Sequence, residues 1–189
     1  MPFRWQIAEA NGPREALRSV RQSIIQVRPL RPEDTVLLER RLASQPTEKH
    51  RVRLAMQQQG QALYLVAWQG EEPVGHVLLK WDGTVDEPMA SQLADCPDIE
   101  DLWVRPDLRS RGIGSLLLGT AEDLARQRGF SQVGLGVGID NLRALALYQR
   151  RGYQDSGLGD FLHAVYYRDD QGRQRVRWET CTYLIKRLR

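Results

Sequence analysis

Apolar and polar residues alternate along the chain with two periods, one typical of strands and one typical of helices. Residues 62–69 and 74–81 are apolar runs, and the segment Gly70-Glu71-Glu72-Pro73 between them predicts a hairpin loop. Residues 112–128 repeat apolar side chains at spacings of three and four, which predicts an amphipathic helix. In full, the pattern predicts strands over 23–27, 62–69, 74–81, 99–104, 131–139, 161–168 and 175–186, and helices over 32–43, 47–59, 112–128 and 140–151.

The order of these elements, β-α-α-β-β-β-α-β-α-β-β, indicates an α/β (α+β) fold in which helices pack on one mixed sheet. We expect a single domain over residues 23–189. Residues 1–22 are polar and are interrupted by Gly12-Pro13, so we interpret them as an N-terminal extension of that domain. Residues 82–97 are predicted to form a loop.

Composition excludes several classes of protein. Hydrophobic residues make up 41% of the 189 residues and charged residues 27%, which is typical of a globular domain and not of a collagen, a disulfide scaffold or a disordered chain. The longest apolar run, Ala62 to Trp68, is too short to span a membrane. The net charge of +3 is small, and no arginine cluster is interleaved with aromatic residues, so we expect no binding to nucleic acid.

The cysteines and histidines do not form a recognisable metal or redox motif. Cys96 and Cys181 are far apart, and no signal peptide precedes them, which predicts a reducing, cytoplasmic location. His50, His76 and His163 are scattered without metal-ligand spacing, so we expect no metal.

The segment with the most specific chemistry is Arg109-Ser110-Arg111-Gly112-Ile113-Gly114, which lies between a predicted strand and a predicted helix. Its glycines let the backbone approach a ligand, and the first N–H groups of a helix have no acceptor within the helix. With the positive end of the helix dipole and with Arg105, Arg109 and Arg111 at the rim, the segment predicts a phosphate or pyrophosphate site. The chain lacks the Gly-Lys pair of a P-loop and has no G-x-G-x-x-G motif.

In its context, this segment resembles the acetyl-CoA signature of the GNAT superfamily of N-acetyltransferases, Q/R-x-x-G-x-G/A after a strand that ends in V-x-P. The chain has Val104-Arg105-Pro106 and then Arg109, Gly112 and Gly114. The family also carries an asparagine at the start of the next helix, then an alanine and a tyrosine, and then a glycine followed by an aromatic residue. The matching residues here are Asn141, Ala144, Tyr148, Gly152 and Tyr153. The resemblance is strong over residues 98–155, and over 23–81 it rests on the order of strands and helices.

The resemblance implies a mixed, splayed sheet of about seven strands, with acetyl-CoA as co-substrate between two parallel strands. It implies that the backbone of Leu102, Trp103 and Val104 pairs with the pantetheine arm. It implies that Asn141 meets the pantetheine or a bound water, and that Tyr148 stands near the thioester sulfur. The pyrophosphate would be held by the amides of Arg109, Ser110, Arg111, Gly112, Ile113 and Gly114, with Ser115 just inside the helix.

Helical spacing supports part of this assignment independently. Asn141 and Tyr148 are seven residues apart and share one helix face, and the small Ala144 between them leaves room for a ligand. Two alternatives remain open at this point. Tyr148 is also compatible with a core tyrosine, and Asn141, beside Asp140, with a helix cap.

Two further patterns lie near the predicted site. In the run Val133 to Ile139 every even position is glycine, so one face of the predicted strand is bare, which predicts either a closely packed helix or a groove for a ligand. Seven acidic residues and no basic ones lie between Trp81 and Val104, which favours either a solvated acidic loop or a field that attracts a cationic amine. Strict alternation would place Asp98, Glu100, Leu102 and Val104 on one face of the strand, along the cofactor cleft.

The chemistry expected of such a site is direct transfer of an acetyl group to a primary amine, in a small molecule or a peptide. A carboxylate must remove a proton from the ammonium, and we rank Glu100 first, Asp98 second and Asp101 third. The Val104 N–H would stabilise the oxyanion, and Tyr148, protonated at neutral pH, would protonate the leaving thiolate. Residues 31–59, 82–97 and 156–176 would surround the amine.

Other functions remain compatible with the sequence. A domain of this kind can bind acetyl-CoA without catalysis, as a sensor or an interaction module, and a wider pocket beside Leu102 and Leu145 would accept longer acyl chains. The sequence does not identify the amine, and it leaves a homodimer open.

Overall fold

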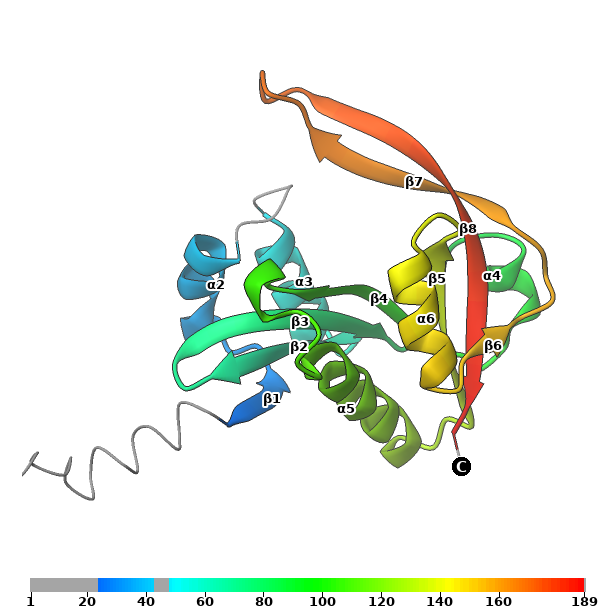
Figure 1. Ribbon diagram of the computed structural model, residues 1–189, viewed down its shortest axis with the longest axis horizontal. Coiled ribbons are helices and arrows are strands. Elements are labelled where there is room, and N and C mark those ends of the chain that lie inside the picture. Colours follow the sequence, from blue (N-terminus) through cyan, green and yellow to red (C-terminus); the bar gives the residue numbers. More distant parts are fainter. Residues whose placement is uncertain (1–23, 43–47, 189) are drawn as a thin grey trace, which may run out of the picture.

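The computed structural model describes residues 24–42 and 48–188. The predicted extension over 1–22 lies outside these residues, so the domain boundaries stay a prediction. Within the described parts, one eight-stranded sheet runs in the order β1-β2-β3-β4-β5-β8-β6, with β7 paired to β8 (Figure 1). The strands are β1 (Ile25–Pro29), β2 (Ala62–Gln69), β3 (Glu72–Lys80), β4 (Asp98–Val104), β5 (Gln132–Gly138), β6 (Gln154–Asp155), β7 (Phe161–Arg168) and β8 (Gln174–Arg187).

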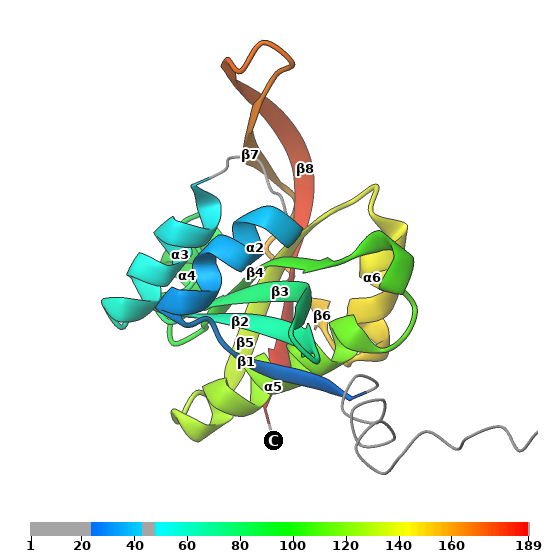
Figure 2. The ribbon, with the colours of Figure 1, turned by 90° about the vertical axis from the view of Figure 1, so that its left-hand side faces the viewer.

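Helices cover both faces of the sheet, as Figure 2 shows from the side. The helical elements are η1 (Pro32–Asp34), α2 (Thr35–Arg41), α3 (Lys49–Gln58), α4 (Met89–Gln92), η2 (Pro106–Leu108), α5 (Ile113–Gln127) and α6 (Leu142–Arg150). The predicted fold class is therefore confirmed. No helix in these ranges is both long enough and apolar enough to cross a membrane.

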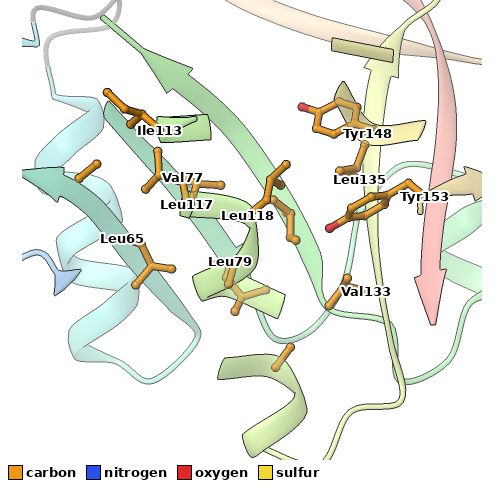
Figure 3. Packing of buried hydrophobic residues seen from close by; sticks show 14 of the residues in the cluster. Leu65, Val77, Leu79, Ile113, Leu117, Leu118, Val133, Leu135, Tyr148 and Tyr153 are labelled. Atoms are coloured by element: carbon orange, nitrogen blue, oxygen red, sulfur yellow. The ribbon is translucent and has the colours of Figure 1, made fainter. Parts of the chain in front are cut away.

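The buried apolar residues form a core on each face of the sheet. On one face, α5 and α6 pack on β2 to β5 through residues such as Leu117, Leu118 and Leu135 (Figure 3). On the other face, α2 and α3 pack on β2 and β3 through residues such as Leu38 and Tyr64. The central strands are therefore buried on both sides and can hold side chains in fixed positions.

Several predicted boundaries were wrong for local reasons. Strand β1 continues through Pro29. The next residue, Leu30, donates its N–H to the Tyr64 carbonyl at 2.8 Å, so the Pro29 nitrogen lies at a position that faces away from β2 and needs no hydrogen. The loop after β2 is shorter than predicted. Gly70 adopts a φ of +62°, which allows a tight turn, and β3 therefore begins at Glu72. Pro73 lies within β3 opposite Trp68, next to a shift in the register of the two strands.

Three short elements were not predicted at all, and the first is the helical turn η2 after β4. The loop over 82–97 contains α4, whose Met89 is fully buried against Phe161, Cys181 and Tyr183. The two-residue strand β6 pairs with β8 and raises the number of strands to eight. All three elements are too short to leave a periodic signal in the sequence.

Candidate active site

Strands β4 and β5 diverge and open a cleft in the middle of the sheet. They are the parallel pair, and their ladder in the described structure is one bridge, Asp98 opposite Gly134. Beyond this bridge the strands separate, and a cleft of about 560 Å³ lies between the end of β4, the start of α5 and one face of α6. The cleft is lined by Leu102, Trp103, Val104, Leu108, Arg109, Ser110, Gly112, Ile113, Gly114, Ser115, Asn141, Arg143, Ala144, Leu147, Tyr148 and Arg150.

The segment that enters α5 presents unpaired backbone donors to this cleft. Gly112 caps the helix with a φ of +84°, and Ser110 also has a positive φ of +62°. The first bond back to this segment is from the Leu116 N–H to the Gly112 carbonyl at 2.9 Å, and within the described chain the N–H groups of residues 110–115 have no protein acceptor. This turn therefore has the donors and the dipole orientation of an anion site.

The free edge of β4 also presents backbone groups to the cleft. The Arg105 N–H donates to the Val74 carbonyl at 2.9 Å, and Trp103 pairs with His76. In an antiparallel ladder, alternate residues direct their backbone N–H and C=O groups toward the partner strand. Trp103 and Arg105 face β3 in this way, so Val104 between them directs its N–H and carbonyl away from β3, toward the cleft. The Val104 carbonyl accepts from Arg109 Nε at 3.0 Å, which leaves the Val104 N–H for a ligand.

Arginines surround the cleft, but not all of those predicted. Arg105 is paired with Asp107 at 2.8 Å, and Arg111 is exposed and does not line the cleft. Instead, Arg143 and Arg150 of α6 line it, and Arg143 donates to Ser110 Oγ at 3.1 Å. Sequence analysis missed both, although their separation of seven residues places them on one helix face.

Helix α6 places its predicted residues along one wall of the cleft. Asn141 is the N-cap, and its side-chain oxygen accepts from the Ala144 N–H at 3.2 Å, so the capping interpretation of Asn141 is correct. The cap is Asn141 itself and not Asp140, because only Asn141 makes this bond. Ala144 is small and also faces the cleft.

Tyr148 is both a core residue and a cleft residue. Only 8% of its surface is exposed, and its ring lies 5.8 Å from that of Tyr153 and beside Leu135 (Figure 3). Burial, and secondarily the negative charge of Asp101, raise the pKa of the Tyr148 hydroxyl to about 12. The hydroxyl is therefore protonated at neutral pH.

The carboxylates of β4 do not share a face with Leu102 and Val104, contrary to the prediction. The register to β3 shifts between Glu100 and Trp103, and Asp101 there has a φ of +49°. This bulge interrupts the alternation, so Leu102 and Val104 pack toward the α5 core while Trp103 packs toward the α3 side. The carboxylates lie on the α3 side of the sheet, across from the cleft.

The carboxylates Asp98 and Glu100 differ strongly in environment. Asp98 is 3% exposed and accepts from the Tyr183 hydroxyl at 2.9 Å. Burial, and then the neighbouring Glu100 charge, raise the pKa of Asp98 well above its usual value. Glu100 is more exposed and accepts from Lys80 Nζ at 2.7 Å.

Asp101, at the bulge, forms ion pairs with Lys49 and Arg53 of α3, and His76 Nδ1 lies 3.6 Å from its carboxylate. Burial works to raise the pKa of Asp101, but the positive charges of Arg53 and Lys49 outweigh it and hold that pKa below its usual value. Burial lowers the pKa of His76 to about 3, so this histidine is neutral. Asp101 is therefore a stable carboxylate that links α3 to the bulge.

A second cavity of about 480 Å³ lies on this α3 side of the sheet. Glu100 and Lys80 contribute to its floor, α3 forms one wall and the β7–β8 hairpin another. The lining residues are Glu48, Lys49, Val52, Arg53, Met56, Leu78, Lys80, Glu100, Tyr166, Tyr167 and Gln174. The two cavities thus lie on either side of the diverging strands.

The bare face of β5 lies against aromatic side chains at Gly134 and Gly136 and not against a helix. A Cβ at Gly134 would overlap the ring of Tyr183 from β8, and a Cβ at Gly136 would lie 3.3 Å from the ring of Phe161. Gly134 allows Tyr183 to lie across β5 and reach Asp98. At Gly134 both alternatives drawn from the glycine pattern were therefore wrong, because the partner is an aromatic side chain distant in sequence. At Gly136, which is exposed, the groove alternative stays a prediction.

Comparison with known proteins agrees with this geometry. The sequence model of the Acetyltransferase (GNAT) family matches residues 30–153, more than half of the chain. An uncharacterized N-acetyltransferase of Methanocaldococcus jannaschii is 33% identical over 86 residues, which cover 44% of this chain. The matched segment covers 35% of that relative's own length.

Solved structures share the fold across nearly the whole described chain. A ribosomal-protein-alanine N-acetyltransferase from Brucella melitensis has a TM-score of 0.63 and 19% identity, covering 86% of this chain and 99% of its own. A putative acetyltransferase from Salmonella typhimurium, solved with its cofactor acetyl-CoA, has a TM-score of 0.62 and 17% identity, covering 87% of this chain and 94% of its own. The family match, the splayed strands and the turn into α5 agree, and this chain belongs to the GNAT family of acetyltransferases.

Proposed function

We propose that this protein is an N-acetyltransferase that moves an acetyl group from acetyl-CoA directly to a primary amine. The observation that carries the proposal is the cleft between the end of β4, the start of α5 and α6, which has unpaired amides at the entry to α5 and the Tyr148 side chain in its wall. Twelve of the thirteen residues predicted to bind acetyl-CoA line this one cleft, and Arg111 is the exception. The fold therefore gathers in one place the groups that an acetyl-CoA site requires.

The cleft offers a separate group of donors to each part of acetyl-CoA. The amides of residues 110–115 hold the pyrophosphate, and Arg143 and Arg150 add positive charge beside them. The free edge of β4 at Leu102 and Val104 hydrogen-bonds the pantetheine arm as an additional strand would. The Val104 N–H donates to the oxyanion that develops during transfer.

The amine reaches the reaction from the second cavity, on the other side of the diverging strands. Glu100 lines that cavity and is the carboxylate that we assign as the base, directly or through water. Asp98 stands behind it with a raised pKa, and Asp101 is held as a carboxylate by Lys49 and Arg53. Tyr148 donates its proton to the leaving thiolate, since thiols have a pKa of about 8.5.

The function is tested by mixing the protein with acetyl-CoA and a panel of amines and measuring thiol release. The panel contains aminoglycosides, polyamines, free amino acids, and peptides with a free N-terminus or a lysine. We expect thiol release above the hydrolysis rate with one class of amine. Tight binding of acetyl-CoA with no release across all classes would instead support the alternative, a non-catalytic acetyl-CoA-binding module.

Substitution of Gly114 by leucine is expected to weaken acetyl-CoA binding by at least about 100-fold in calorimetry. A Cβ at this position points toward Leu147, Leu102 and Val104, at 3.6 to 3.9 Å, so a longer side chain fills the floor of the cleft. Leucine is a better helix former than glycine, so the fold should be retained. Gly114→Ala adds only one methyl group at ordinary contact distance and serves as the matched control. Unchanged affinity in Gly114→Leu would contradict the placement of the cofactor.

Glu100→Gln is expected to lower kcat by roughly 100-fold with little change in acetyl-CoA affinity, as removal of a general base does. Asp101→Asn is the comparison variant, because it lies one residue away and on the same side of the sheet. Steady-state rates over a range of pH measure both. A larger loss in Asp101→Asn than in Glu100→Gln would show that the base has been assigned to the wrong carboxylate.

A further inference from the structure

The second cavity is built from three segments that are far apart in the sequence. Helix α3 forms one wall, β3 and β4 form the floor, and the β7–β8 hairpin forms another wall through Tyr166 and Tyr167. Figure 1 shows this hairpin reaching over the side of the sheet that carries α3. The cavity volume of about 480 Å³ lies within the range of about 300–1,000 Å³ of small-molecule sites, so the cavity can hold one small substrate.

Apolar side chains line this cavity on both walls, and the domain itself leaves them largely uncovered. Val52 on α3 is 56% exposed, and Tyr166 and Tyr167 on β7 are 59% and 41% exposed. Met56 and Leu78 also line the cavity and belong to the apolar core on the α3 side of the sheet. A ligand with an apolar body would therefore cover side chains that now face water, beside a surface that is already packed.

The charged side chains of the cavity do not favour a polycation. Among the described residues, its lining contains three cations and two carboxylates, which are Lys49, Arg53 and Lys80, and Glu48 and Glu100. Of the seven acidic residues over 82–101, Glu100 alone lines the cavity within the part of the chain that the structure describes. A second ammonium group in the cavity would meet three positive charges, and like charges at close range oppose binding.

Ion pairs hold these cations in place and leave room for one ammonium group. Lys49 and Arg53 both pair with Asp101, and Lys80 pairs with Glu100 at 2.7 Å. A carboxylate can accept several hydrogen bonds, so Glu100 can accept from one ammonium group of a substrate beside Lys80. The cavity thus combines one site for a single positive charge with two apolar walls.

We propose that the preferred substrate of this protein is a primary amine with one positive charge and an aromatic body, an arylalkylamine. The inference rests on the proposed function, because it takes the second cavity as the amine site. The ammonium group lies at Glu100, and the aromatic ring packs between α3 and the β7–β8 hairpin, against Val52 and Tyr166. A polyamine or an aminoglycoside would leave the apolar walls in water and bring further positive charges beside the cations of the lining.

Thiol release with three amines that differ in body and charge tests this substrate class. The wild-type protein is given saturating acetyl-CoA and either phenethylamine, ethylamine or putrescine. We expect kcat/KM for phenethylamine to exceed that for each of the other two at least about ten-fold, because only its ring covers the apolar walls. Calorimetry with phenethylamine in the presence of coenzyme A measures its binding without a transfer step.

Variants on the two walls test where the ring binds. Val52→Ser and Tyr166→Ala each remove apolar surface from one wall, and each should lower the ratio of kcat/KM for phenethylamine to that for ethylamine at least about five-fold. A general loss of activity would lower both rates and leave this ratio unchanged. Val36→Ser and Leu162→Ser are the matched controls, because Val36 is a 51% exposed valine on α2, Leu162 is exposed on β7, and neither residue lines either cavity. Both controls should keep the wild-type ratio.

The outcomes separate this inference from the proposed function. A preference for phenethylamine that falls in Val52→Ser and Tyr166→Ala, and persists in the controls, supports the inference. An equal or higher kcat/KM for putrescine or ethylamine overturns it and leaves the proposed function in place, as does a preference that survives both substitutions.

If none of the three amines gives thiol release, calorimetry decides the inference, and the wider panel of amines decides the proposed function. Phenethylamine binding that Tyr166→Ala weakens at least about ten-fold would still support the inference. Absence of binding, or binding that Tyr166→Ala does not change, would overturn it.

Discussion

Tyr148→Phe is expected to lower kcat by between about 10² and 10⁴ while the affinity for acetyl-CoA changes by less than about two-fold, because the change removes one proton donor and no packing surface. Burial raises the pKa of this tyrosine to about 12, so its proton is in place at neutral pH. Within the described chain the hydroxyl has no hydrogen-bond partner, so phenylalanine leaves no buried group unsatisfied. Stopped-flow transfer rates and calorimetry measure the two quantities.

Tyr153→Phe is the control for this prediction. Its ring lies 5.8 Å from that of Tyr148, but its hydroxyl donates to Glu122 Oε1 at 3.1 Å, away from the cleft. We expect Tyr153→Phe to cost about 1 kcal/mol of stability through the lost hydrogen bond and to leave kcat near the wild-type value. If Tyr148→Phe weakened binding and turnover equally, or if Tyr153→Phe lowered kcat as much, the tyrosine would be a structural residue.

The parts of the site made from backbone were predictable from the sequence. The turn at Ser110 and Gly112 follows from local rules about glycine and helix starts. These rules need only neighbouring residues. The edge at Val104 was implied by the resemblance to the GNAT superfamily, and the wall at Ala144 by that resemblance together with helical spacing. Of the thirteen residues predicted to bind acetyl-CoA, all but Arg111 line one cleft, and their role in binding stays a prediction.

The parts that depend on register or on distant partners were not predictable. The bulge at Asp101 moves Leu102 and Val104 to the face of the sheet that packs on α5, and the spacing of the acidic residues does not predict this bulge. Tyr183 fills the bare face at Gly134 from a strand about fifty residues later. This bulge separates the carboxylates from the cleft in which we propose that acetyl-CoA binds, and it places them on the side from which we propose that the amine enters.

Loss of the Glu122 carboxylate is expected to give the largest change in stability. Glu122 lies on α5, is 3% exposed, and accepts from Arg151 Nη2 at 2.6 Å, Lys186 Nζ at 2.6 Å and the Tyr153 hydroxyl at 3.1 Å. Glu122→Ala leaves two largely buried cations without their partner. We expect a loss of about 3–5 kcal/mol in the free energy of unfolding, measured by denaturant titration.

Asp123→Ala is the matched control for Glu122→Ala, because the two acids are adjacent on α5. Asp123 is exposed, and among the residues that the structure describes it pairs only with Arg126, so its loss should cost less than about 1 kcal/mol. An equal effect of the two substitutions would contradict the assignment. Glu122 joins α5 to the segment after α6 and to β8, so it sets the separation of the two helices that border the cleft. Glu122→Ala should therefore also weaken acetyl-CoA binding under conditions in which the protein remains folded, whereas Asp123→Ala should leave that binding unchanged.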